Sequence, residues 1–356
     1  MKILHTSDLH IGHSVSGIDR GEEYERFFEW FEGVANEKKP DCVIVAGDVF
    51  DVYFPSNEAI RQYYDFLLSL RDKAKKVIII GGNHDSFKTL KAPKEILKYL
   101  DVVVVSGSED DFCEFVEFDD FVVVAVSYLR EGILKKYDDD IEKAIFKLYQ
   151  EKLKEAKEKF PGKKLVTTAH FSVSGASLGD SERDIYVGNL EFVSKDVFEG
   201  YDYVALGHIH KPQKITENII YSGSPLALSF KETYQKNIVF IEDDNIEFIN
   251  VPKFREFASI KGSFKEVYEK ISEMKDAFLE IVLDEIVDSE KLKLLKNGEN
   301  HIVKITLPYV KEIKNFEVKK VTPEDIIKEI FDEKEIIEAF YEIKKEVEDE
   351  FGKVED

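Results

Sequence analysis

Short apolar runs alternate with longer stretches of helical periodicity through about the first 210 residues of the chain. Because the runs are rich in β-branched residues, they indicate buried strands, and strands that alternate with helices are typical of an α/β fold. The predicted strands are Lys2–Thr6, Cys42–Ala46, Val77–Ile80, Val102–Val105, Val122–Val126, Leu165–Ala169 and Tyr203–Leu206.

Amphipathic helices are predicted between these strands, where apolar residues recur at i, i+3, i+4 and i+7. The apolar positions of the first helix are Tyr24, Phe27, Phe28, Phe31 and Val34. Those of the second are Ile60, Tyr64, Leu67 and Leu68. Those of the third, which follows three aspartates, are Ile141, Ile145, Leu148 and Tyr149. We therefore expect sheets that are covered by helices.

From residue 219 onward the pattern changes to short strands and turns. A hairpin is predicted from Asn237–Ile241 and Asn245–Val251, with two aspartates at its turn. A boundary is expected near Pro252, so that residues 1–252 form the first domain.

Two further segments follow the first domain. Short strands around one helix predict a small α+β domain at 253–321. The last segment, 322–356, begins with Thr322 and Pro323, which match a helix N-cap followed by proline at the first helical position. Two short amphipathic helices are predicted there, with apolar residues Ile326, Ile327, Ile330 and Phe331, and Ile336, Phe340, Ile343, Val347 and Phe351.

The composition limits which functions are plausible. Hydrophobic residues make up 43% and aromatic residues 12% of the 356 residues, which excludes a disordered acidic chain. The formal net charge of −22 disfavours a simple basic nucleic-acid module, because it repels a polyanion at long range. The last segment alone has 14 acidic and 5 basic residues, so much of this acidity is far in sequence from the first domain.

The number of cysteines and the length of the apolar runs indicate the cellular compartment of the protein. Two cysteines, Cys42 and Cys113, exclude a disulfide framework and a thiolate zinc site. The N-terminus is too short in apolar length for a signal peptide, and no apolar run reaches the roughly 18 residues of a membrane span. We therefore expect a cytoplasmic protein with no membrane partner.

Candidate metal ligands follow five of the predicted strands. In open α/β sheets ligands bind outside the carboxyl ends of the strands, so loops that are distant in sequence can converge there. Spacings of the Asp-x-His and His-x-His type place two side chains on the same side of an extended backbone. The five blocks are Ser7–His10, Gly47–Asp51, Gly82–Asp85, Ala169–His170 and Gly207–His210.

Oxygen and imidazole ligands without thiolate suit Mn²⁺, Fe²⁺ or Zn²⁺ better than Ca²⁺. The ligands are too many for one tetrahedral ion and fit two ions that share a carboxylate. We assign one ion to Asp8, His10, Asp48 and His210. The other is assigned to Asp48, Asn83, His170 and His208, so that Asp48 bridges. Two dications would outweigh the two aspartates and attract a phosphate at short range.

His84 follows a predicted ligand but is not counted as one. We expect it to be the catalytic residue, which faces the substrate and protonates or stabilises the leaving oxygen, with Asp85 orienting it. In a later loop, Arg183 is a candidate substrate contact. His5 and His301 are interpreted as structural or solvent-facing, and His13 lies close enough to the first block for a supporting role.

The five blocks resemble those of the calcineurin-like metallophosphoesterase superfamily and, in finer wording, the SbcD nuclease family. Further matching strings are Gly175–Ser177, Arg183–Gly188 and Ser222–Pro225, and the likeness is dense over 1–252. The resemblance implies a β-sandwich flanked by helices, with 253–321 as a capping domain. It also implies a DNA nuclease with two Mn²⁺, with Mg²⁺, Fe²⁺ or Zn²⁺ as alternatives, and with exonuclease activity on double strands and endonuclease activity on single strands.

The same resemblance implies interaction partners, and it also shows one position, Asp51, at which this chain differs from some members of the family. It implies a role in processing double-strand breaks or hairpins, a homodimer, and an SbcC-type coiled-coil ATPase bound through the helices of 322–356. Some relatives carry His where this chain has Asp51, so Asp51 is a candidate substrate-binding residue and the balance between the two nuclease activities is open. The alternatives are a small-molecule phosphoesterase of the same superfamily and a non-catalytic scaffold for an ATPase.

Overall fold

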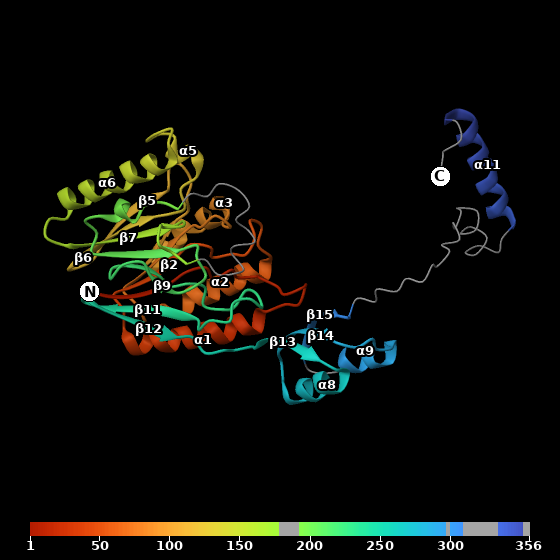
Figure 1. Cartoon of the computed structure of the whole chain (residues 1–356). Helices are drawn as coiled ribbons and strands as arrows, with labels where there is room; N and C mark the ends of the chain where they lie inside the picture. The colour runs from red at the N-terminus through yellow and green to blue at the C-terminus, as the bar shows by residue number, and fades with distance from the viewer. Residues whose placement is uncertain (178–191, 297–299, 309–333, 352–356) are drawn as a thin grey trace. The chain divides into compact units, whose positions relative to one another are not determined.

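The computed structural model describes residues 1–177, 192–296, 300–308 and 334–351 (Figure 1). It divides the chain into two units, Met1–Leu307 and Pro308–Asp356. Each predicted strand of the first 210 residues is present, within a residue of its expected bounds. The first unit contains two six-stranded sheets and one three-stranded sheet.

The first large sheet has the strand order β12-β11-β1-β2-β3-β4. Its parallel strands are β1 (Lys2–Thr6), β2 (Cys42–Ala46), β3 (Lys76–Ile80) and β4 (Val102–Val105). The predicted hairpin is confirmed as β11 (Asn237–Glu242) and β12 (Asn245–Asn250), and it extends the sheet antiparallel to β1. The connecting helices are α1 (Gly21–Lys38), α2 (Asn57–Ser69), α3 (Phe87–Lys91), α4 (Lys94–Leu97) and the 3₁₀ turn η1 (Lys98–Leu100).

The second large sheet has the order β5-β6-β7-β8-β10-β9. Its strands are β5 (Cys113–Glu117), β6 (Phe121–Val126), β7 (Lys164–His170), β8 (Tyr203–Gly207), β9 (Gln213–Lys214) and β10 (Ile219–Tyr221). Between them lie α5 (Glu131–Leu134), α6 (Ile141–Lys159) and the 3₁₀ turn η2 (Lys195–Phe198). Strand β5 is not predicted from the sequence, because its mostly half-buried residues do not form an apolar run.

The two large sheets pack face to face between layers of helix. The core between them contains Ile44 and Ile78 from the first sheet and Val123 and Val166 from the second. Helices α1 and α2 cover the outer face of the first sheet, and α6 covers the outer face of the second (Figure 1). Because the central strands are buried on both faces, they read as continuous apolar runs. The expected β-sandwich flanked by helices is confirmed.

Helix α2 packs three of its four expected apolar positions on the core: Leu67 is buried, and Ile60 and Tyr64 are partly buried. Ser56 caps its first turn by accepting a hydrogen bond from the Ala59 amide. From that start the buried stripe runs through Tyr63 and Phe66, whereas Leu68 is 51% exposed. The expected choice of Leu68 is therefore wrong, because in this phase it lies on the outer side of the helix.

The small sheet follows the boundary expected near Pro252. Its strands are β13 (Phe257–Gly262), β14 (Phe278–Leu283) and β15 (His301–Thr306), with α8 (Phe264–Glu273) and α9 (Ser289–Lys296) between them. A capping box between Ser263 and Glu266 fixes the start of α8. Because the strands pair in parallel and alternate with helices, this part has an α/β pattern rather than the expected α+β pattern.

Aromatic contacts join the small sheet to the rest of the first unit. The Phe257 ring on β13 lies 5.1 Å from Phe230, in the segment before β11. The buried Arg20 guanidinium lies 5.3 Å from the Phe257 ring and 5.9 Å from the Phe278 ring. The same guanidinium bonds to Glu23 and to Nδ1 of His13. The small sheet therefore packs close to the loop that carries the first predicted ligands.

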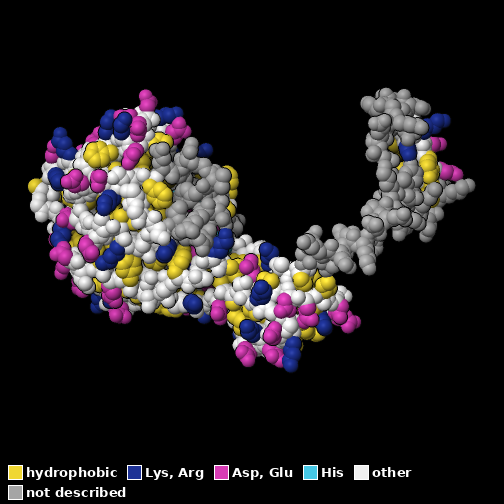
Figure 2. Space-filling model, viewed as in Figure 1, with side chains coloured by type: hydrophobic (Ala, Val, Ile, Leu, Met, Phe, Trp, Pro, Cys, Tyr) yellow, Lys and Arg dark blue, Asp and Glu magenta, His cyan; other side chains and the backbone are white. Residues whose placement is uncertain are grey.

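In the second unit the described residues form helix α11 (Lys334–Phe351). It corresponds to the second of the two helices expected in 322–356, and the first lies outside the described residues. Across the described residues, no helix combines the length and the apolar character that crossing a membrane requires. On the face of the first unit seen in Figure 2, acidic and basic side chains are interspersed.

Candidate metal centre

The five blocks meet where strands of the two large sheets end. Three of them follow β1, β2 and β3 in the first sheet, and two follow β7 and β8 in the second. Two contacts join the sheets here: His170 Nδ1 lies 2.9 Å from the Ala46 carbonyl oxygen, and the His208 amide donates to Asp8 Oδ1 at 2.8 Å. The expected convergence of these loops is present.

Several of the converging residues have left-handed backbone conformations. The φ angles are 52° at Asp8, 48° at His10, 48° at Asp48 and 92° at His208. Such conformations cost residues other than glycine roughly 1–3 kcal/mol each and cluster at functional sites. Backbone hydrogen bonds hold the loops in this shape, from the Asp8 amide to Gly47 at 2.9 Å and from the His10 amide to Asp48 at 3.0 Å.

Two glycines let the loops approach one another. Gly47 has a φ of 89°, and a Cβ at this position would clash with the His170 ring. A Cβ at Gly82 would clash with Asp48. Gly82 is therefore required by the close approach of two blocks and not by a sharp turn of its own.

The site contains two groups of three side chains that are suited to a metal ion. One group is Asp8, His10 and His210, and in the other Asp48, His170 and His208 come together. Within each group the ligand atoms lie within 4.8 Å of one another. His10 Nε2 is buried without a hydrogen-bond partner, although burying such a polar atom is unfavourable unless a partner binds it. The residues therefore fit a divalent metal ion.

Asp48 and Asn83 lie between these side chains. Asp48 Oδ2 is 3.1 Å from His170 Nε2 in its own group and 3.8 Å from His10 Nε2 in the other. The Asn83 amide oxygen is 3.0 Å from His170 Nε2 and 3.0 Å from His208 Nδ1. All seven predicted ligands are thus brought together, with Asp48 adjacent to both groups.

The electrostatics of the centre reflect this crowding. Burial lowers the pKa of His170, but the Asp48 carboxylate outweighs burial and raises that pKa to about 9. Burial raises the pKa of Asp48, but His170 and then His10 outweigh it and hold that pKa far below its usual range. Burial and the neighbouring His170 lower the pKa of His208 to about 3. The Asp48 carboxylate therefore favours the protonated form of His170, and a metal ion that binds here competes with that proton.

Two predicted ligands have carboxylate partners on their outer side. His10 Nδ1 lies 3.3 Å from Asp51 Oδ1, and His210 Nδ1 lies 3.1 Å from Glu232 Oε1. Metal-binding histidines commonly donate their second ring N–H to a carboxylate, which fixes the orientation of the ring. The hydrogen bond is formed at His210, whereas Asp51, which was expected at the substrate, lies beside His10 without a hydrogen bond to it.

Asp85 does not orient His84, so that interpretation is wrong. The buried Asp85 carboxylate accepts from the amides of Val49 at 3.1 Å, Phe50 at 2.9 Å and Gly82 at 2.8 Å. It therefore ties the second block to the third. Burial, with Asp48 second, raises the pKa of Asp85.

His84 lies exposed at the edge of the centre. Its Nδ1 is 2.8 Å from the Asp51 carbonyl oxygen, and its amide donates to Asp48 Oδ1 at 2.9 Å. Its ring centroid is 5.0 Å from that of His10. The backbone of the second block therefore orients the ring, which is accessible to a substrate.

One further predicted site residue, Arg183, and three histidines that were not predicted as ligands remain to be placed. Arg183 lies outside the described residues. His5 is buried in β1, 2.9 Å from the Tyr203 hydroxyl, which agrees with a structural role. His13 bonds to Arg20, and burial followed by Arg20 lowers its pKa to about 4. His301 is 3.3 Å from Asp276, away from the five blocks.

The sequence analysis misses Glu232 as a residue of the site. It lies in an irregular segment with no motif spacing, and only the fold brings it to His210. Burial raises the pKa of Glu232, but Lys236 and His210 outweigh burial and hold that pKa below its usual range. The available signal is a Glu and a Lys four residues apart in a segment that also contains apolar residues.

Strand ends that gather two adjoining groups of carboxylate and imidazole side chains are typical of enzymes that use two metal ions, among them phosphoesterases. Comparison with known proteins agrees, since the calcineurin-like phosphoesterase family matches residues 1–212. The chain belongs to this family and, within it, to the SbcD nucleases.

The relatives that support this assignment span most of the chain. The SbcD subunit of the nuclease SbcCD from Escherichia coli strain K12 is 30% identical, covering 86% of this chain and 84% of that protein. The Bacillus subtilis strain 168 protein of the same name is 28% identical over 99% of this chain and 100% of its own. The Staphylococcus epidermidis protein is 28% identical over 78% and 76%. The chain is therefore a metal-dependent nuclease.

Proposed function

We propose that the chain is a DNA nuclease that holds two Mn²⁺ ions in the two ligand groups, with Asp48 shared between them. The observation that carries this proposal is the position of Asp48 next to both His10 and His170, beside the exposed His84. Mg²⁺, Fe²⁺ and Zn²⁺ suit the same ligand chemistry. The names of the relatives support nuclease activity, and DNA is the substrate that we propose.

Each side chain has a role in the proposed reaction. Two ions bound here supply Lewis-acid stabilisation of the phosphodiester and activation of the attacking water. Asp8, Asp48 and Asn83 provide oxygen ligands, and the Asp51 carboxylate lies 3.3 Å from the second ring nitrogen of His10. His84, oriented by the Asp51 carbonyl, donates a proton or a hydrogen bond to the leaving oxygen.

The net charge of the chain affects how strongly the isolated protein binds DNA. The net charge of −22 opposes approach of a polyanion, whereas the centre attracts one phosphate once dications are bound. We therefore expect weak, salt-sensitive DNA binding by the isolated chain, which a second copy or a partner strengthens. In this proposal residues 1–252 are the nuclease domain and 253–321 the capping domain.

We propose that the chain forms a homodimer. Exposed apolar side chains on the helical side of the first sheet support this, with Leu68 on α2, Ile96 on α4 and Tyr99 on η1. Ile96 is 71% and Tyr99 is 90% exposed. Large exposed apolar side chains that gather in one patch are typical of interaction surfaces, and Ile96 and Tyr99 lie three residues apart.

We also propose that segment 322–356 binds a coiled-coil ATPase partner of the SbcC type. The relatives are named as subunits of SbcCD, which supports a partner subunit. Helix α11 leaves Ile336 41% and Ile343 62% exposed in the second unit. An amphipathic helix with an uncovered apolar face fits a groove on another protein.

One experiment tests the proposed activity directly. The purified chain is incubated with linear duplex DNA, with single-stranded circular DNA, and with a chromogenic phosphomonoester, each with Mn²⁺ or with a chelator. We expect Mn²⁺-dependent shortening of the duplex and nicking of the single strand, with little hydrolysis of the monoester. Rapid monoester hydrolysis with intact DNA would instead support a small-molecule phosphoesterase, and inertness toward all three would support a scaffold.

A further inference from the structure

We propose that Glu232 is a positioning residue that sets the affinity of one of the two metal ions through His210. This inference rests on the proposed function, because it takes His210 as a ligand of the ion that Asp8 and His10 also bind. It assigns a role to a residue outside the five blocks, on a segment without regular secondary structure between β10 and β11. The role is to orient the imidazole and not to touch the substrate.

The Glu232 carboxylate is hydrogen-bonded to the His210 ring. Glu232 Oε1 lies 3.1 Å from His210 Nδ1, so that Nδ1 donates to the carboxylate and Nε2 presents its lone pair to an ion. A charged acceptor also makes the imidazole a stronger ligand. His210 follows β8 by three residues, so its ring is not held by a strand, and the Glu232 carboxylate is placed to fix its orientation.

The second step is that Glu232 is itself held rigidly. Its side chain is 1% exposed. Its other oxygen, Oε2, accepts from Lys236 Nζ at 2.6 Å and from the Leu228 amide at 3.0 Å. Lys236 Nζ also donates to Ser224 Oγ at 2.7 Å, and the Ser224 amide donates to the His210 carbonyl at 3.1 Å. These contacts close a ring that begins and ends at His210.

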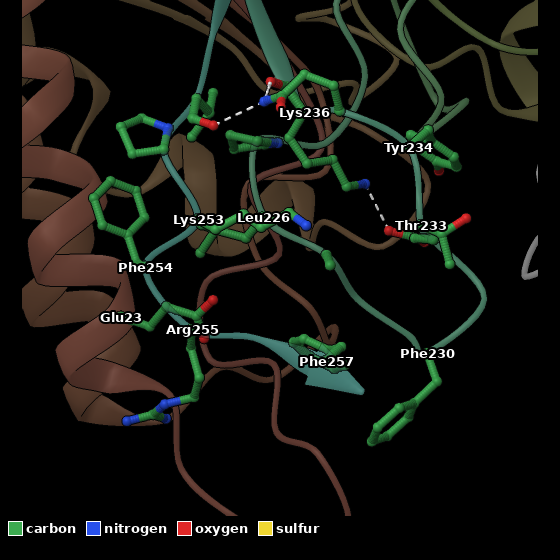
Figure 3. A pocket seen from close by; sticks show the side chains of 16 residues that line it. Glu23, Leu226, Phe230, Thr233, Tyr234, Lys236, Lys253, Phe254, Arg255 and Phe257 are labelled. Carbon is green, nitrogen blue, oxygen red and sulfur yellow. Dashed lines mark hydrogen bonds and ion pairs between the residues drawn. The ribbon is translucent and has the colours of Figure 1, made fainter. Parts of the chain in front are cut away.

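Burying the ion pair between Glu232 and Lys236 removes both charges from water, and a purely structural role does not explain this free-energy cost. Burying a carboxylate and an ammonium is often no more stabilising than burying apolar side chains of similar volume. Here Glu232 and Lys236 both line a cavity of about 180 Å³ near the start of β13. Figure 3 shows Lys236 in this cavity together with the aromatic rings of Phe230 and Phe257. Apolar side chains would fill such a space, whereas only a carboxylate both accepts from His210 Nδ1 and balances Lys236.

The test compares Glu232→Gln, Glu232→Ala and a matched control, Lys94→Met. The glutamine variant keeps an acceptor oxygen without the charge, and the alanine variant removes both. Lys94 forms a comparably buried pair with Asp111, at 14% and 8% exposure, and neither residue is a candidate ligand. Mn²⁺ affinity and stoichiometry are measured by calorimetry and by the spin-resonance signal of free Mn²⁺, and the melting temperature of each metal-free protein is recorded.

We expect wild type to bind two Mn²⁺ ions. Glu232→Ala should bind one of them with unchanged affinity and the other ~10–100-fold more weakly, with Glu232→Gln in between. Lys94→Met should lower the melting temperature and leave both affinities unchanged. If Glu232→Ala lowers only the melting temperature and binds both ions as wild type does, the positioning role is overturned. If wild type itself binds no Mn²⁺, the proposed function fails instead.

Discussion

The backbone of the metal centre is strained at its ligands. Asp8, His10, Asp48 and His208 all have positive φ angles, and the surrounding hydrogen bonds must maintain this geometry. The convergence of the predicted ligands is predictable from sequence, because polar residues after parallel strands meet at the carboxyl ends of the sheet. Glu232 and the backbone contacts of Asp85 are not predictable, because they depend on the path of irregular segments and follow no spacing rule.

Asp48→Ala tests the shared ligand. Because Asp48 lies beside both His10 and His170, we expect its loss to weaken Mn²⁺ binding at both groups by at least ~100-fold. Calorimetric titration with Mn²⁺ measures this, with Asp65→Ala on the exposed side of α2 as a control. Two ions bound with wild-type affinity by Asp48→Ala would contradict a shared position.

His5 predicts how stability depends on pH. Burial lowers its pKa from 6.5 to about 3, so below pH 6.5 the unfolded chain binds a proton that the folded chain cannot. Stability should therefore fall as the pH drops from 6.5 toward 3, by about 2 kcal/mol at pH 5 from this group alone. His5→Gln, which cannot titrate, should lose less stability between pH 7 and pH 5 in urea denaturation. An equal loss in both proteins would assign the acid sensitivity to other groups.

At the scale of elements, apolar runs and periodicity predict most of the fold. The buried strands are predicted within a residue, because strands covered on both faces need continuous apolar sequence. The phase of α2 and the edge strand β5 are less predictable, since both are only partly buried and their patterns depend on what packs against them. The parallel pairing of β13 to β15 likewise appears only in three dimensions.

Helix α11 carries a prediction of its own. Deleting 322–356 should abolish binding to the coiled-coil ATPase partner and leave the nicking of short DNA unchanged. In the full chain, Ile343→Asp should weaken the same binding, because it places a charge on the exposed apolar face, whereas Glu342→Gln should not. Co-purification of the two proteins measures this, and unchanged binding after the deletion would place the interface elsewhere.

At the scale of the whole molecule, the acidic charge has to be reconciled with a nucleic-acid substrate. A net charge of −22 disfavours a broad basic surface as the source of affinity, and part of this charge is carried by the last segment. In our proposal, the metal ions and a second copy of the chain therefore contribute more to DNA binding.

The homodimer prediction concerns the exposed residues near α4. Ile96→Glu together with Tyr99→Glu should convert the dimer to a monomer, because charges replace apolar side chains that are 71% and 90% exposed. Tyr268→Glu on α8, also an exposed aromatic position, serves as the control. Sedimentation or light scattering gives the mass, and a monomeric wild type would contradict the proposal.

The central claim is that this centre cleaves DNA with metal ions and His84. The most direct measurement compares wild type with His84→Ala on linear duplex DNA at saturating Mn²⁺, with bound Mn²⁺ quantified in the same samples. We predict that His84→Ala binds Mn²⁺ as wild type does and cleaves at least ~100-fold more slowly, since general acid catalysis contributes about 10²–10⁴-fold. Cleavage by His84→Ala at the wild-type rate, or a wild type that binds Mn²⁺ and leaves DNA intact, would contradict the account.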